Sequence, residues 1–206
     1  MIYLVRHGQT AFNLEQRHHG HTDSPLTRLG REQARLAGNT LLTLVDPQNS
    51  VVFTSPLGRT LQTAEIIWRV ARITAPIVID PDLMEIGMGS AEGMTEAEMR
   101  ERWPGAKTAS AHESMTLQSP DGESLEALTK RLRRALGRVA RHNAASRIIV
   151  SHGVSGRVLR ALHLGLSSAD VYRLDAPQDA LFCLNDIGVT RYSISRTKSP
   201  LKARTS

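Results

Sequence analysis

Apolar and polar positions follow two different periodicities along the chain, one typical of strands and the other of amphipathic helices. Short apolar runs at residues 2–5, 51–54, 77–80 and 147–150 predict strands. Between these runs, apolar residues recur at spacings of three and four, which predicts helices with one buried face. Strands that alternate with helices favour a mostly parallel sheet with helices on both of its faces.

Four long helices are expected between and after these strands. Thr27 is predicted to cap the first, whose apolar face comprises Leu29, Leu36, Ala37, Leu41 and Leu44. Ser55-Pro56 suits the cap and first position of the second, whose buried stripe comprises Leu57, Leu61, Ala64, Trp68 and Ala71. The third contains the apolar residues Leu125, Leu128, Leu132, Leu136 and Val139, and the fourth spans 154–164.

Two more strands, 180–185 and 189–194, are separated by only three residues, which predicts a hairpin with an antiparallel edge strand. The fold class is therefore α/β, a three-layer α/β/α sandwich with a mostly parallel central sheet. A single domain over residues 1–194 accounts for the pattern. Residues 87–121 are richer in Gly, Met, Ser and Pro, with one short helical patch near 95–103, and we expect them to form a lid or pocket wall. Residues 195–206 are expected to form a basic, flexible tail.

Composition narrows the class of protein. The 206 residues are 40% apolar, which is enough for a substantial core, and Cys183 is the only cysteine, so no intrachain disulfide can form. No segment approaches the roughly 18–20 apolar residues that cross a bilayer. The net charge is +6, but only 4% of residues are aromatic, which favours a solvated basic helix face over a nucleic-acid groove. We expect a cytoplasmic protein that binds neither nucleic acid nor membrane. The oligomeric state is open, and a homodimer is one option.

Three of the predicted strands end in related sequences. Residues 3–5 run into Arg6-His7-Gly8, and residues 148–150 run into Ser151-His152-Gly153. The strand at 51–54 is followed by Ser55-Pro56, with Arg59 one turn into the next helix. The carboxyl ends of parallel strands meet at one edge of a sheet, where open α/β folds bind ligands. These basic side chains are therefore expected to converge.

Such a cluster is suited to phosphate chemistry. The guanidinium groups of Arg6 and Arg59 match phosphoryl oxygens, and Gly8 and Gly153 let backbone N–H groups approach an anion. Surrounding positive charge lowers the pKa of a histidine, so one ring nitrogen of His7 stays free to act as a nucleophile. The result is a phosphohistidine, and His152 then stabilises the transferring group.

The leaving alkoxide also needs a proton donor. Glu85 lies among Leu83, Met84, Ile86 and Met88, and apolar neighbours favour the protonated carboxyl that a general acid requires. Glu92 is the rival candidate, ranked lower because the flanking glycines indicate a structural turn.

The residues around His7 are similar to a known family signature. The run 6–13, RHGQTAFN, resembles the RHGxTxxN motif of the histidine phosphatase superfamily, in its phosphoglycerate-mutase-like branch. The resemblance continues in order through 23–34, 55–64, 83–93, 122–124 and 151–153. It implies an α/β sandwich without metal or other cofactor. It also implies that His7 is the phosphorylated nucleophile, that Arg6, Arg59, His152 and Asn13 contact phosphate, and that Glu85 donates the proton.

The same site can hydrolyse the phosphohistidine or return the phosphoryl group to another hydroxyl. In cofactor-dependent phosphoglycerate mutases the acid glutamate is typically followed by arginine, whereas Ile86-Gly87-Met88 stands here, which favours hydrolysis of small-molecule phosphate monoesters. A mutase is the alternative, and a non-catalytic phospholigand-binding module is a third. Ile86 and the nearby methionines could contact a partly apolar substrate or could only pack the pocket wall, and the sequence does not favour either interpretation.

Three other features have a structural interpretation. The run 17–21, RHHGH, is expected to be a loop bordering the pocket rather than a metal site, because no carboxylate or cysteine joins it at ligand spacing. Ser151 and Ser155 lack the G-x-S-x-G context of a hydrolase nucleophile. Cys183 fits a small buried hydrophobe.

Overall fold

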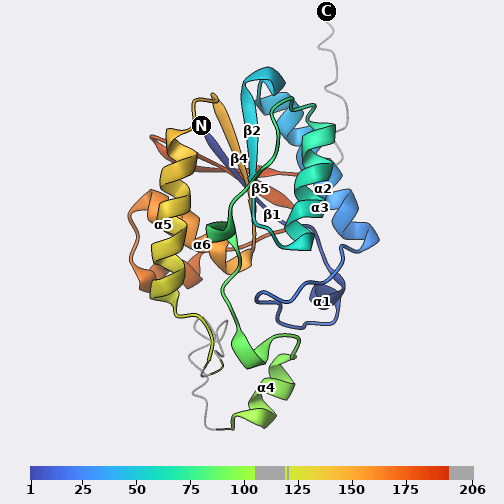
Figure 1. Ribbon diagram of the computed structural model, residues 1–206, viewed down its shortest axis with the longest axis vertical. Coiled ribbons are helices and arrows are strands. Elements are labelled where there is room, and N and C mark those ends of the chain that lie inside the picture. The colour runs from blue at the N-terminus through green and yellow to red at the C-terminus, as the bar shows by residue number, and fades with distance from the viewer. Residues whose placement is uncertain (105–118, 120, 195–206) are drawn as a thin grey trace, which may run out of the picture.

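The computed structural model describes residues 1–104, 119 and 121–194, and a six-stranded sheet forms its centre (Figure 1). The strands are β1 (Ile2–Arg6), β2 (Ser50–Thr54), β3 (Val78–Ile79), β4 (Ser146–Ser151), β5 (Ala180–Asn185) and β6 (Gly188–Ser193). Their order is β3-β2-β4-β1-β5-β6. The first four are parallel, β5 runs antiparallel to β1, and β6 pairs antiparallel with β5. The predicted α/β class is confirmed, and the predicted hairpin lies at one edge.

The helices are α1 (Ala11–Leu14), α2 (Arg28–Leu44), α3 (Gly58–Val70), α4 (Glu96–Arg102), α5 (Leu125–Arg141) and α6 (Gly153–Leu164). Short 3-10 turns occupy Pro47–Asn49, Pro81–Leu83, Gly89–Ala91 and Ser168–Arg173. Thr27 caps α2 as predicted, because its side chain accepts the Gly30 N–H. The four residues of α1 are too few for a periodic pattern to reveal. Across the described ranges, no helix combines the length and hydropathy that a bilayer crossing requires.

Two apolar layers enclose the sheet because successive strand residues point to opposite faces. Leu4 and Ile149 pack into one core together with residues of α5 and α6. Val5 and Val150 pack into the other core, with residues of α2 and α3. Figure 1 shows the two helix pairs on opposite sides of the strands, which is the three-layer arrangement.

Several local predictions are wrong. Leu29, placed on the buried face of α2, is 51% exposed, and the edge strand β3 is shorter than predicted, with both of its residues exposed. The second predicted helix begins at Gly58, and its N-cap residue, Leu57, makes no side-chain cap. The carboxylate of Asp23 caps α3 instead, because it accepts the backbone N–H groups of Gly58 and Arg59.

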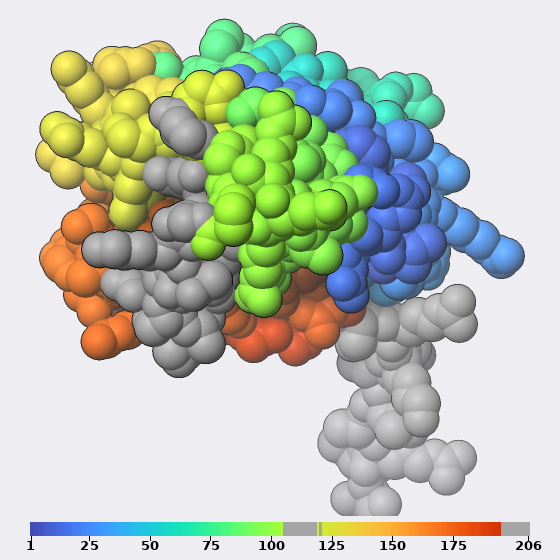
Figure 2. All heavy atoms as spheres, turned by 90° about the horizontal axis from the view of Figure 1, so that it is seen from below, coloured from blue at the N-terminus to red at the C-terminus, as the bar shows by residue number. Residues whose placement is uncertain are grey.

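The predicted excursion at residues 87–121 is described only in part. Its helical patch is α4, and Figure 2 shows α4 on the lower face of the molecule beside the N-terminal segment. An isolated bridge between Arg17 and Thr95 joins these two segments. Residues 105–118, residue 120 and the predicted basic tail at 195–206 lie outside the described residues.

Candidate active site

A cavity of about 290 Å³ lies at the carboxyl ends of β1 and β4. Register explains why distant residues meet there, because Arg6 at the end of β1 pairs with Ser151 at the end of β4. The cavity wall includes Arg6, His7, Asn13, Arg59, Glu85 and Gly153. The predicted strand-end residues are therefore brought together around one space.

His7 is held as a neutral imidazole. Its side chain is 2% exposed, and its Nδ1 lies 2.8 Å from the carbonyl oxygen of Gly8. Since a carbonyl only accepts, Nδ1 carries the proton and Nε2 keeps its lone pair. Burial, followed by the charges of Arg6 and Arg59, lowers the pKa of His7 well below its usual value of 6.5. The predicted lowering of the His7 pKa is confirmed, and burial contributes more to it than the neighbouring positive charges do.

His152 lies beside His7, with ring centroids 5.3 Å apart in an edge arrangement. Its Nε2 is 2.9 Å from the hydroxyl of Ser55, so this serine, which also accepts the N–H of Leu57 before α3, orients the histidine. Burial, then Arg59 and His7, lowers the pKa of His152 well below 6.5. Nδ1 of His152 is buried and makes no hydrogen bond within the described part of the chain.

The two arginines are anchored, and each has a buried Nε atom without a hydrogen-bond partner among the described residues. Arg6 donates from Nη1 to the carbonyl of Ala176 at 2.5 Å, and burial lowers the pKa of Arg6 to about 10. Arg59 is fully buried and donates to the carbonyls of Thr22 and Gly20 at 3.0 and 2.8 Å.

These unpartnered nitrogens identify the site. In residues 1–104, 119 and 121–194, four buried side-chain nitrogens lack a hydrogen bond, and three of them are Arg6 Nε, Arg59 Nε and His152 Nδ1. An unsatisfied buried donor costs about 1–3 kcal/mol. A group with several acceptor oxygens and negative charge would satisfy all three, and a phosphoryl group has both properties.

The carboxylate of Glu85 lies at the N-terminus of α6 rather than in the apolar setting predicted from its neighbours. It accepts the N–H groups of Val154 and Ser155 at 3.0 and 2.9 Å, and the Ser155 hydroxyl at 2.9 Å. The neighbours Ile86 and Met88 are buried, but they do not surround the carboxyl group with apolar atoms alone. These hydrogen bonds fix the position of the Glu85 carboxyl group in the cavity wall.

Glu92, the rival candidate, has a structural task. Its carboxylate accepts the N–H groups of His21 and Thr22 at 2.8 and 2.7 Å, and the Thr22 hydroxyl at 2.6 Å. Burial opposes ionisation, but these hydrogen bonds together lower the pKa of Glu92. Glu92 thereby holds the loop whose carbonyls anchor Arg59, which agrees with its lower ranking as an acid.

Gly8 has a different role from the predicted one. Its N–H donates to the Thr63 hydroxyl at 3.1 Å, and a Cβ here would lie 2.1 Å from the carbonyl oxygen of Gly30. Gly8 therefore allows close packing against α2, and its N–H is already used. A Cβ on Gly153 would meet Arg6 at an ordinary 3.6 Å, so the space there does not require glycine.

Asn13 lines the cavity with its amide orientation fixed. Its Oδ1 accepts the N–H of Thr10 at 3.1 Å and the side-chain N–H of Gln178 at 3.0 Å. The amide nitrogen of Asn13 is thus the group left to donate. Gln178 also donates to the backbone carbonyl of His7 at 3.1 Å, a contact that the sequence did not reveal.

Comparison with known proteins agrees with this geometry. A family model described as the histidine phosphatase superfamily (branch 1) matches residues 2–195. The chain belongs to this superfamily. A protein of Enterobacter sp. (strain 638), named a probable phosphoglycerate mutase GpmB, is 36% identical over 174 residues, which cover 84% of this chain and 79% of the relative.

Solved structures show the same fold. A mycobacterial glucosyl-3-phosphoglycerate phosphatase is 27% identical, with a TM-score of 0.75, and the match covers 88% of this chain and 92% of that one. The α-ribazole phosphatase from Shigella flexneri is 24% identical, with a TM-score of 0.77, and the match covers 94% of this chain and 95% of that one. At this identity the likeness shows the fold alone. The superfamily thus includes proteins named as phosphatases and as mutases, and its membership supports an enzyme of phosphoryl chemistry.

Some residues that line the cavity were not predicted as site residues. His19 lies in the loop expected to border the pocket, with its ring centroid 5.8 Å from that of His7. Burial, then Arg59 and Arg6, lowers the pKa of His19 to about 3. Arg157 follows Gly153 by one turn of α6, a spacing that could have revealed it. Within the described ranges, no group of three or more His, Cys, Asp or Glu residues is placed to hold a metal ion.

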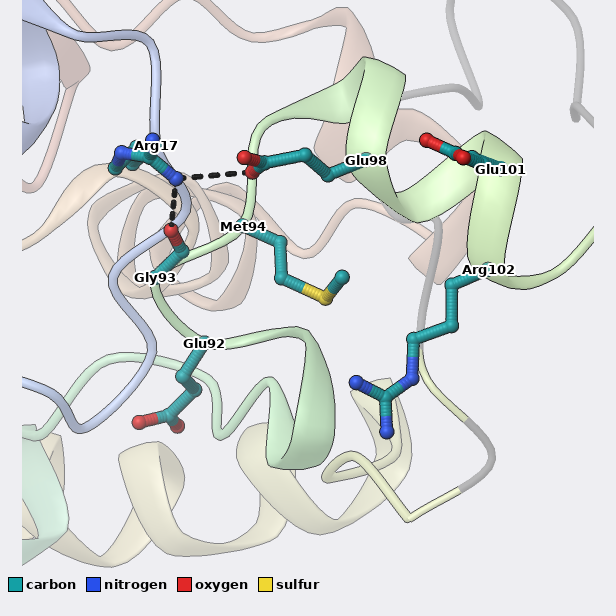
Figure 3. Close-up of a pocket in the computed structure, with 7 residues that line it drawn as sticks. All are labelled: Arg17, Glu92, Gly93, Met94, Glu98, Glu101 and Arg102. Atoms are coloured by element: carbon teal, nitrogen blue, oxygen red, sulfur yellow. Dashed lines mark hydrogen bonds and ion pairs between the residues drawn. The ribbon is translucent and has the colours of Figure 1, made fainter.

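Arg17 joins the cavity to α4. Figure 3 shows its guanidinium directed at Gly93 and Glu98, with Nη1 2.7 Å from the carbonyl of Gly93 and 2.9 Å from Glu98 Oε2. Glu98 also completes the capping box of α4 by accepting the N–H of Thr95 at 2.7 Å. Through Arg17, the short helix α4 is fixed beside the entrance of the site.

Proposed function

We propose that this protein is a metal-independent phosphatase that hydrolyses small-molecule phosphate monoesters through a phosphohistidine on His7. One observation carries the proposal: Arg6 and Arg59, which line the cavity with His7, and His152, whose ring lies beside that of His7, each have a buried nitrogen without a partner among the described residues, and His7 keeps a free Nε2. A binding module needs the donors but has no use for a histidine kept deprotonated, nor for a carboxylate in the same cavity wall.

The proposed reaction has two displacements on phosphorus. Nε2 of His7 attacks the phosphorus atom, the ester P–O bond breaks, and the leaving alkoxide takes a proton from Glu85. Water then attacks the phosphohistidine, Glu85 recovers a proton from that water, and inorganic phosphate leaves. Oε2 of Glu85 accepts one hydrogen bond, from Val154, whereas Oε1 accepts three. We therefore assign the transferred proton to Oε2.

Donors aimed at the phosphoryl oxygens provide the electrostatic part of catalysis. Phosphoryl transfer depends on positioning and on stabilising charge at these oxygens, and one pre-oriented donor is worth roughly 10²–10³ in rate. Arg6, Arg59 and His152 supply such donors without reorganisation, because each is already held at its other atoms. Asn13 and the N–H of Gly153 are the further phosphate ligands in this proposal. The proposal includes neither metal nor cofactor.

Phosphoglycerate mutase is the second candidate, because the relative with 36% identity carries that name. The wall next to Glu85 favours hydrolysis. Ile86 and Met88 line the cavity where an added basic residue would hold a substrate carboxylate in a mutase.

Release of inorganic phosphate from para-nitrophenyl phosphate and a panel of alkyl phosphates, with EDTA present, tests the proposal. We expect turnover by the wild type and none by His7→Ala. Absence of hydrolysis, with conversion of 3-phosphoglycerate to 2-phosphoglycerate in the presence of the bisphosphate, would make the protein a mutase. Inactivity in both assays with retained phosphate binding would favour the binding module.

A further inference from the structure

The backbone that carries Glu85 has no regular secondary structure. Residues 84–88 lie between the 3-10 turns Pro81–Leu83 and Gly89–Ala91, so their carbonyl groups have no strand partner, and that of Met88 accepts the N–H of Ala91 in the following turn. Buried carbonyls nevertheless need hydrogen-bond partners. In this segment the partners include side chains and backbone groups of other elements, and Arg131 of α5 binds the carbonyls of both Met84 and Glu85.

Arg131 uses all five of its N–H donors. Nε and Nη2 bind the carboxylate of Glu123 at 2.7 and 2.6 Å. The other three donors go to backbone carbonyls of the Glu85 segment. These bonds reach Asp82 at 2.9 Å, Met84 at 2.7 Å and Glu85 at 2.8 Å. One planar guanidinium therefore binds three carbonyls within four consecutive residues.

Glu123 holds the other end of the same segment. Its Oε2 accepts the N–H of Gly87 at 3.1 Å, and its backbone N–H donates to the Gly87 carbonyl at 2.8 Å. The side chains of Arg131 and Glu123 are only 13% and 18% exposed, so water screens their interaction weakly. Burial opposes ionisation of Glu123, but the hydrogen bond from Arg131 and that from Gly87 lower the pKa of Glu123 overall.

We propose that Arg131 and Glu123 are positioning residues that hold Glu85 at the distance and angle required for proton transfer. The inference rests on the proposed role of Glu85 as general acid. Arg131 binds the backbone of Glu85 and α6 binds its carboxylate, and α6 begins directly after His152. The acid is thereby held in one position relative to the phosphate ligands. Lysine cannot replace this fork, because its ammonium has three donors on one atom.

Leaving-group dependence separates positioning from general damage. An alkyl phosphate releases a basic alkoxide that needs the proton, whereas para-nitrophenyl phosphate releases a stabilised phenolate that needs it far less. General acid catalysis contributes about 10²–10⁴-fold, and a displacement of about 1 Å can cost 10²-fold. We expect Arg131→Lys to lower kcat/KM for an alkyl phosphate about 10- to 100-fold more than for the nitrophenyl ester. The ratio is independent of the fraction of folded enzyme.

Arg134→Lys is the matched control. Arg134 lies on the same helix, is 53% exposed, and binds the carboxylate of Asp82 rather than any backbone carbonyl of the segment. We expect its substrate ratio to equal that of the wild type. Glu123→Gln removes the charge partner of Arg131 and is expected to shift the ratio in the same direction as Arg131→Lys.

Glu85→Gln separates the positioning role of Arg131 from the general-acid role of Glu85. If Glu85→Gln lowers alkyl phosphate turnover selectively and Arg131→Lys lowers both substrates equally, the positioning role is refuted while the acid role stands. If Glu85→Gln itself affects both substrates equally, the acid role fails and the positioning proposal fails with it. Selective loss in both variants, with a normal ratio in Arg134→Lys, supports the proposal.

Discussion

Replacing Gly30 with alanine should damage both stability and the site, although alanine is the better helix former. Gly30 lies in the first turn of α2, where alanine normally stabilises a helix by about 1 kcal/mol relative to glycine. A Cβ at Gly30, however, would lie 2.0 Å from the carbonyl oxygen of Gln9 and 2.8 Å from its nitrogen. Both atoms are backbone, so no side-chain rotation relieves the contact.

The size of the effect follows from the geometry. The lower limit for real contacts of a Cβ is 3.0 Å, so α2 and the chain at Gln9 must separate by about 1 Å. Overpacking costs about 1–3 kcal/mol, and a backbone contact of 2.0 Å places Gly30→Ala in the upper part of that range, above the helix gain. Gln9 is two residues from His7, and a shift of about 1 Å at a reacting group can cost 10²-fold in rate.

Urea denaturation and steady-state hydrolysis of para-nitrophenyl phosphate measure the two effects. We expect Gly30→Ala to lower the free energy of unfolding by about 1–2 kcal/mol and kcat/KM by at least about tenfold. Gly137→Ala is the control, because its Cβ would meet only the end of the Arg141 side chain at 3.5 Å, and it should be stabilising by about 0.5–1 kcal/mol. A Gly30→Ala variant as stable and active as the wild type would refute the reasoning.

Two further predictions concern the supports of the site. Asp23→Ala removes the acceptor of the Gly58 and Arg59 N–H groups. We expect the free energy of unfolding, measured by urea denaturation, to fall by about 1 kcal/mol, and kcat/KM to fall as well. Wild-type values for both would contradict this role of Asp23. The pKa values of His7 and His152 are lowered on folding, so the unfolded chain takes up protons first as the pH falls below about 6.5. The free energy of unfolding should therefore decline below that pH, and urea denaturation from pH 7 to 5 measures the decline. His7→Asn should make this decline shallower by up to about 1.4 kcal/mol per pH unit. An unchanged slope would contradict a buried neutral His7.

The core of the site could be predicted from the sequence because parallel strands fix which chain ends meet. Arg6 and His7 follow β1, His152 follows β4, and Arg59 lies one turn into the helix after β2. Parallel direction, which the alternation of strands and helices predicts, places these strand ends at one edge of the sheet, whereas the order of the strands is seen only in the structure. The recognition of the superfamily from the motif around His7 is likewise confirmed.

The features that the sequence did not predict depend on contacts between residues far apart along the chain. The neighbours of Glu85 along the chain are apolar, but its carboxylate meets the N-terminus of α6, some 70 residues later in the sequence. Gly8 lacks a Cβ because α2 packs against it, which no local pattern reveals. Arg131 lies among several other basic residues of α5, a pattern typical of a solvated helix face, yet its side chain is only 13% exposed.

The most direct test of the central claim is detection of the phosphoenzyme. Wild-type protein is mixed with excess alkyl phosphate, quenched under alkaline denaturing conditions, and analysed by intact mass and peptide mapping. We expect one added phosphoryl group on His7 that is stable in base and lost in acid, and no such adduct in His7→Ala. Turnover by the wild type with the phosphoryl group on another residue, or with none trapped at any time in the first turnover, would contradict His7 as the nucleophile.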